Sequence, residues 1–90
     1  MYAALVSVTI DPEVQEAAQS ALATEVVPMV AKAPGFIAGY WLEPKDGKGF
    51  SMVLFESEQQ ARQTAPPAGT TPMPGVKVDS VEFRGVVAHG

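Results

Sequence analysis

The 90-residue sequence predicts an α+β fold with the element order β-α-β-β-α-β. Two observations lead to this prediction. A pair of segments rich in aromatic and branched residues, joined by a stretch rich in Pro, Asp and Gly, is typical of a β-hairpin. Helix-start patterns occur once before this hairpin and once after it. A chain of this length is expected to form one domain, residues 1–90.

The central hairpin is predicted over residues 36–43 and 50–56, with the turn over residues 44–49. Before it, residues 2–10 (YAALVSVTI) are apolar and β-branched, which indicates a strand. Asp11-Pro12 then predicts a helix start, because Asp caps free N–H groups and Pro is tolerated in the first turn. This helix is expected to end by Ala33, with a kink or break at Pro28.

After the hairpin, Ser57 and Gln60 have the spacing of a capping box, which predicts a second helix. Pro66-Pro67 should end it at about Ala65, and residues 65–75 read as a loop. The last strand is predicted over residues 76–88. Neither of its alternating rows is cleanly apolar, so a bulge is expected, with Gly85 as its site.

This order is the split βαβ arrangement of ferredoxin-like folds, with a four-stranded antiparallel sheet and both helices on one face. The predicted strands carry apolar residues on both of their sides. Because two helices cover only one face of a sheet, the other face needs a partner, and a second copy of the chain is the simplest one. A homodimer is therefore expected.

Composition narrows the possible functions. The formal net charge is −4, which disfavours binding to nucleic-acid phosphates, and no apolar run is long enough to span a membrane. No basic region precedes the first apolar run, so a cytoplasmic location is expected. The chain has no cysteine and one histidine, and no constellation of metal ligands is recognisable. No cofactor is expected.

Several short motifs resemble the dimeric α/β-barrel superfamily, in particular antibiotic biosynthesis monooxygenase-like domains. They are the strand–helix opening, the PGF step at residues 34–36, the Tyr40-Trp41 pair and FESEQQA at residues 55–61. The resemblance implies ferredoxin-like protomers whose sheets pack back to back in a homodimer, with a pocket between sheet and helices. Some members of that superfamily oxidise aromatic polyketide-like compounds without a cofactor, and others degrade haem.

The sequence departs from the catalytic members of that superfamily. It contains no asparagine, so the Asn-containing sites of those members cannot be transferred to it. Its only histidine, His89, is the penultimate residue, which leaves no helix-borne histidine to ligate haem. The resemblance therefore implies a fold and an assembly, and it implies no activity.

Five residues are candidates for ligand binding: Tyr40, Trp41, Glu82, Arg84 and His89. Either aromatic residue could stack on a flat apolar ligand, and the alternative is burial in the core or in a dimer interface. Glu82 and Arg84 lie on one row of the last strand, where they either grip a polar ligand group or form an exposed pair. His89 is the first choice for a general base, and the alternative is a solvated terminal residue.

Two hypotheses remain, and they leave open whether the protein is an enzyme. In the first, a homodimeric barrel binds a small apolar or aromatic molecule, with cofactor-free oxygenase chemistry as an extension. In the second, the same fold is a non-catalytic assembly or partner-binding module. A cavity with a few inward polar groups favours the first, and an interior filled by side chains favours the second.

Overall fold

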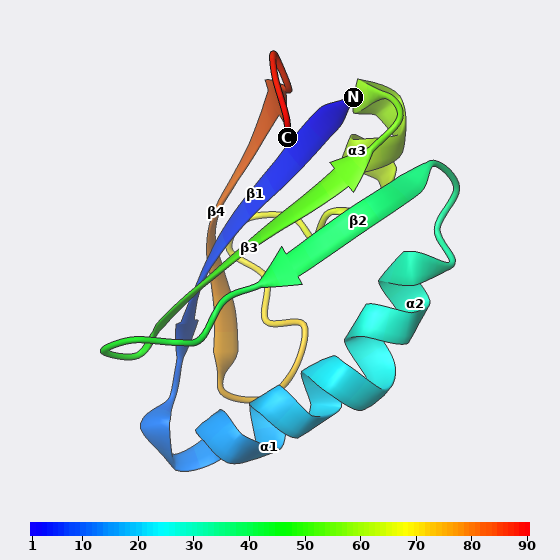
Figure 1. Ribbon diagram of the computed structural model, residues 1–90. Helices are drawn as coiled ribbons and strands as arrows, with labels where there is room; N and C mark the ends of the chain where they lie inside the picture. The colour runs from blue at the N-terminus through cyan, green and yellow to red at the C-terminus, as the bar shows by residue number, and fades with distance from the viewer.

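The computed structural model describes residues 1–90 and contains four strands and a set of helical segments (Figure 1). The strands are β1 (Tyr2–Ile10), β2 (Phe36–Trp41), β3 (Lys48–Phe55) and β4 (Val76–Gly85). The helical segments are the 3-10 turn η1 (Pro12–Val14), α1 (Gln15–Ala21), the π-helical turn η2 (Leu22–Val26), α2 (Val27–Ala31) and α3 (Glu58–Thr64). The strands form one antiparallel sheet in the order β2-β3-β1-β4. The predicted ferredoxin-like βαββαβ fold is confirmed.

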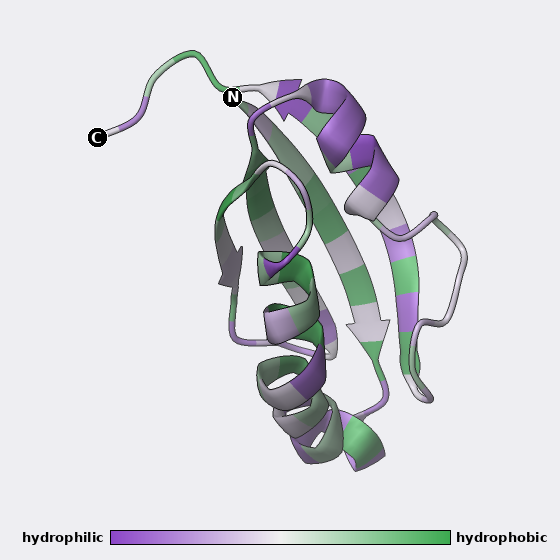
Figure 2. Ribbon diagram, turned by 90° about the vertical axis from the view of Figure 1, so that its right-hand side faces the viewer, coloured by the Kyte–Doolittle hydropathy of each residue, from purple (hydrophilic) through white to green (hydrophobic).

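One face of the sheet packs against the helices. Ala4 of β1 is paired with Val53 of β3. Both side chains belong to a buried cluster that also contains Phe55 of β3 and Ala61 of α3. Val30 of α2 packs against the same cluster, so α2 and α3 lie on the same face of the sheet. The segments α1, η2 and α2 follow one another without a gap, and we call them together the α1–α2 helix. Figure 2 shows this helix in front of the strands, which carry alternating bands of hydrophobic colour. We call this surface the helix face and the opposite surface the open face.

A bulge in β4 lies at Asp79, and the expectation of a bulge at Gly85 is wrong. Ser7 pairs with Ser80 while Val8 pairs with Val78, so β4 carries one residue more than β1 at this point. Side chains along a strand normally alternate between the two faces with a period of two. Because of the extra residue, Val78 and Val81 both face the helices although they are three residues apart. This register change explains why neither row of β4 is apolar throughout. Gly85 ends the strand in regular pairing with Tyr2, three residues before the predicted end.

The first helix is divided near Pro28, as its sequence predicts, but the irregularity begins earlier. Between Leu22 and Val26 the chain forms a π-helical turn, in which the Val27 N–H donates to the Leu22 carbonyl, five residues back. Pro28 has no N–H to donate, so the helix cannot keep its regular hydrogen-bond ladder across this segment. The helix ends at Ala31, within the limit set by Pro34.

The hairpin connection lies two residues earlier than its sequence predicts. β2 ends at Trp41 and β3 begins at Lys48, whereas the sequence favoured ends at residues 43 and 50. Lys45 and Lys48 exchange two backbone hydrogen bonds of 2.9 and 3.0 Å around Asp46-Gly47. Asp46 and Gly47 have φ of 54° and 75°, the left-handed values that a two-residue hairpin turn requires.

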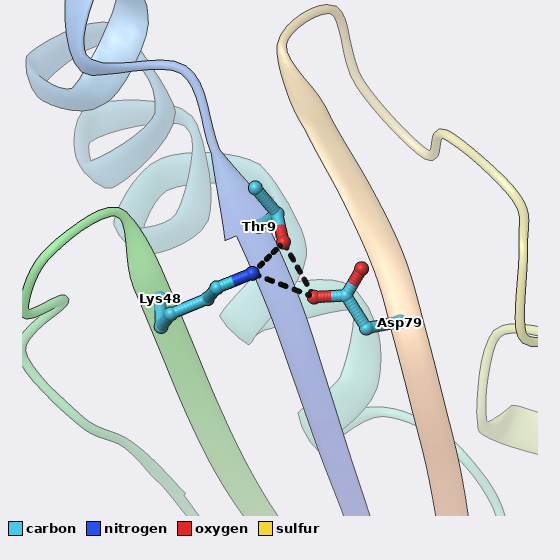
Figure 3. A network of polar contacts seen from close by, with 3 residues as sticks. All are labelled: Thr9, Lys48 and Asp79. Carbon is cyan, nitrogen blue, oxygen red and sulfur yellow. Dashed lines mark hydrogen bonds and ion pairs between the residues drawn. The ribbon is translucent and has the colours of Figure 1, made fainter.

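The open face is apolar at its centre and polar at one end. Leu5 pairs with Met52 and Ala3 with Leu54 on this face, while Phe50 and Tyr40 beside them are 42% and 53% exposed. At the end of β1 the Thr9 hydroxyl donates to Asp79 Oδ2 (2.5 Å) and accepts from Lys48 Nζ (2.8 Å), as Figure 3 shows. This network joins β3, β1 and β4 side by side. None of the helices combines the length and apolar character needed to cross a bilayer.

Candidate functional site: an apolar pocket under the first helix

The principal cavity lies between the helix face of the sheet, the α1–α2 helix and the loop before β4. Its volume is about 610 Å³, and 18 of its 26 lining residues are hydrophobic. This is within the range of small-molecule pockets. The floor consists of β-strand residues, among them Ala4, Val6, Val8, Ile10, Ser51, Val53, Phe55, Val76 and Val78. The helical wall consists of Ala18, Gln19, Leu22, Val26, Met29 and Val30.

The cavity exists because small residues occupy the space between helix and sheet. Ser51 of β3 lines the pocket floor with a small side chain, while the side chains of Val8 and Ile10 lie over Gly49. On the helix, Ala18 is buried, while η2 and α2 contain no fully buried residue. The helix therefore covers the sheet without filling the gap, and apolar side chains such as Leu22 and Val26 line the space that remains.

The proline-rich loop forms a further wall. Residues 65–75, the predicted loop, contribute Ala65, Pro66, Pro72 and Met73 to the pocket lining. The loop is fastened to the outer edge of β4: Gly69 N–H donates to the Val78 carbonyl (2.7 Å) and Val78 N–H to the Thr70 carbonyl (2.8 Å). These bonds also protect part of an edge strand from pairing with another chain.

Trp41 is the one candidate residue that the structure places in the pocket. It pairs with Ser51 on the helix face, and its indole ring lies over Gly39. A Cβ atom at position 39 would lie 2.5 Å from Trp41 Cη2, so only glycine allows the ring this position. Tyr40 lies on the open face, paired with Met52, and does not contact the pocket.

The other three candidates lie away from the pocket. Glu82 and Arg84 are more than half exposed on β4, with 3.5 Å between Arg84 Nη2 and Glu82 Oε1. Such an exposed pair contributes little to stability. His89 lies in the exposed segment after β4. The structure brings none of the three together with Trp41.

The polar groups of the pocket were not singled out from the sequence. They are the side chains of Gln19, Glu43, Ser51 and Thr64. Glu43 is exposed, and it also lines the pocket beyond the end of β2. The available signal was its spacing of two from Trp41, which places both residues toward one face of an extended chain. No group of three or more acidic or histidine side chains is arranged so that it could hold a metal ion.

No known family model matches this chain, and no curated protein is similar to it in sequence.

Proposed function

We propose that the protein binds a small, largely apolar molecule in the cavity beneath the α1–α2 helix. The observation that carries the proposal is a preformed cavity of about 610 Å³ with 18 hydrophobic lining residues and a few polar side chains. Ligand pockets typically combine an apolar lining with a small number of polar groups that orient the ligand. An aromatic group fits the proposal, since Trp41 offers a ring for stacking.

Binding is a better-supported function than catalysis. Glu43 is the only titratable side chain that lines the pocket, and it forms no hydrogen bond or ion pair with another side chain. General acid–base catalysis usually relies on a positioned group whose orientation a neighbour fixes. Cofactor-free oxygenase chemistry, the extension of the first hypothesis, would have its substrate beside Trp41, and Glu43 would be the one titratable group of the lining to assist it.

A neutral fluorescent probe, N-phenyl-1-naphthylamine, tests the binding proposal by the rise of its emission on titration. Ser51→Phe places a large ring on the pocket floor and should weaken binding at least tenfold. Gln63→Phe is the matched control, because Gln63 is exposed on α3 outside the pocket and away from the open face. Equal affinities for both variants, or no saturable binding by the unaltered protein, would refute the proposal.

We propose in addition that the open face pairs with the open face of a second copy. Leu5, Met52 and Leu54 lie next to one another on the open face of β1 and β3, where they are partly exposed, and Phe50 beside them is 42% exposed. Charges of both signs border this patch, with Lys48 and Asp79 at one end and Glu82 and Arg84 on β4. In a dimer with a two-fold axis through the patch, the positive groups of one copy can lie opposite the negative groups of the other, so that like charges do not meet.

Native mass spectrometry and sedimentation velocity test this assembly. We expect the unaltered protein to be a dimer and Leu54→Lys to be a folded monomer, because the substitution buries a charge at the centre of the interface. Gln63→Lys introduces the same charge on the exposed side of α3 and should remain dimeric. A monomeric unaltered protein would refute the paired-sheet proposal.

A further inference from the structure

The pocket is unusual in its charge. Among its 26 lining residues there is one acidic side chain, Glu43, and there is no lysine, arginine or histidine. A bound anion would therefore have no cationic partner there, and burying an unpaired charge among apolar side chains is costly. A bound cation would have one partner of opposite charge. The lining thus distinguishes ligands by charge as well as by size.

Glu43 is available for such a ligand. The three ion pairs of the structure use Asp79, Glu58 and Glu82, and no side-chain hydrogen bond involves Glu43. Glu43 lies two residues beyond Trp41, and both residues line the pocket, although the indole ring extends the other way, over Gly39. The Trp41 ring is positioned by its packing over Gly39.

A carboxylate at the rim of an apolar pocket can bind an organic ammonium group, and an indole ring in the same lining adds a second attraction for a cation. The face of an indole carries negative electrostatic potential and attracts cations, most strongly among the aromatic side chains. The carboxylate adds a charge-assisted hydrogen bond to an N–H donor. The apolar cavity behind them accepts the rest of the molecule.

We propose that the natural ligand is an amphiphilic organic cation: an apolar body that fills the cavity and a protonated amine held at the rim by Glu43, the one charged residue of the lining. This inference rests on the proposed binding function and specifies the chemical class of its ligand. Glu43 is the residue that determines specificity. The negative net charge of the chain, −4, favours the approach of such a ligand over long range.

Three ligands of equal shape test the inference: 1-adamantanemethylamine, 1-adamantanemethanol and 1-adamantanecarboxylic acid. At pH 7 they are cationic, neutral and anionic, and none absorbs where tryptophan does. Because Trp41 is the only tryptophan, its fluorescence reports on binding at the rim. We expect the amine to bind about tenfold more tightly than the alcohol, and the acid most weakly, as one charge-assisted contact predicts.

Two variants separate a specific effect of Glu43 from general attraction. Glu43→Gln should bring the affinity for the amine down to that for the alcohol and leave the alcohol unchanged. Glu56→Gln, an exposed carboxylate outside the pocket, makes the same change in net charge and should preserve the preference for the amine. Equal binding of amine and alcohol, or a preference that survives Glu43→Gln, would overturn this inference and leave the apolar-pocket proposal standing. Failure of all three compounds to bind would overturn this inference, and the titration with N-phenyl-1-naphthylamine would then decide the apolar-pocket proposal separately.

Discussion

Replacement of Gly39 by alanine tests the position of the Trp41 ring directly. In the structure the added methyl group would lie 2.5 Å from Trp41 Cη2 and 2.6 Å from Cζ3. Ordinary carbon–carbon contacts are about 3.5–4.0 Å, so the outer edge of the indole has to move by about 1 Å or more. Overpacking of this kind costs about 1–3 kcal/mol of stability. Alanine in a strand regains about 0.5–1 kcal/mol relative to glycine, which leaves a net loss of about 1 kcal/mol.

The measurement combines urea denaturation with the emission spectrum of Trp41. Gly85→Ala is the matched control, since it is also a strand glycine, and its new Cβ would lie 3.8 Å from the Tyr2 ring, an ordinary contact. We expect Gly85→Ala to be neutral or slightly stabilising, and Gly39→Ala to be destabilised, with an altered emission maximum and weaker probe binding. If Gly39→Ala behaved like the control in all three measurements, the ring could not lie over residue 39.

Three further predictions concern the sheet and its helices. Phe55→Ala should lower the free energy of unfolding by about 3–5 kcal/mol, because Phe55 is only 1% exposed within the core cluster; a loss under 1 kcal/mol in urea titration would contradict that burial. Ser57→Ala removes the N-cap acceptor of α3, and the length of its bond to the Gln60 N–H, 3.3 Å, indicates a cost near 0.5 kcal/mol; Ser57→Asp should restore the cap. Asp79→Asn should lower the free energy of unfolding by less than about 1 kcal/mol, because the pair of Lys48 and Asp79 is exposed and its charges are 3.9 Å apart. The loss should shrink in high salt, and a salt-independent loss would show that the network is more than a surface ion pair.

The secondary-structure order was predictable because each element carries its own local signal. Asp11-Pro12 and Ser57 mark helix starts that the structure confirms, and both side chains accept a hydrogen bond from the backbone of the first turn. The aromatic and branched strands were recognisable for the same reason, since their residues suit a pleated surface. Strand ends were less predictable: the turn that joins β2 and β3 depends on hydrogen bonds between Lys45 and Lys48, and several nearby residues were plausible turn formers.

The pocket was only partly predictable. The alternation of side chains along a strand separates Trp41 from Tyr40, but it does not say which of them faces the helices. The pairing of Trp41 with Ser51 decides that question, because Ser51 lies in the row of β3 that packs toward the helix face. Glu43 was overlooked because a carboxylate at a strand end is usually solvated, and its place at the pocket rim depends on where β2 stops.

The sequence by itself determined the order of the elements, the helix caps and the need for a break near Pro28, since these follow from residues close to one another in the chain. Contacts between distant segments decided the rest. The bulge at Asp79 arises from the pairing of β4 with β1, across some 70 residues of chain, and it sets which side chains of β4 face the helices. The cavity likewise lies between distant segments, the α1–α2 helix, the strands and the loop before β4, so it depends on packing between elements and on no single segment.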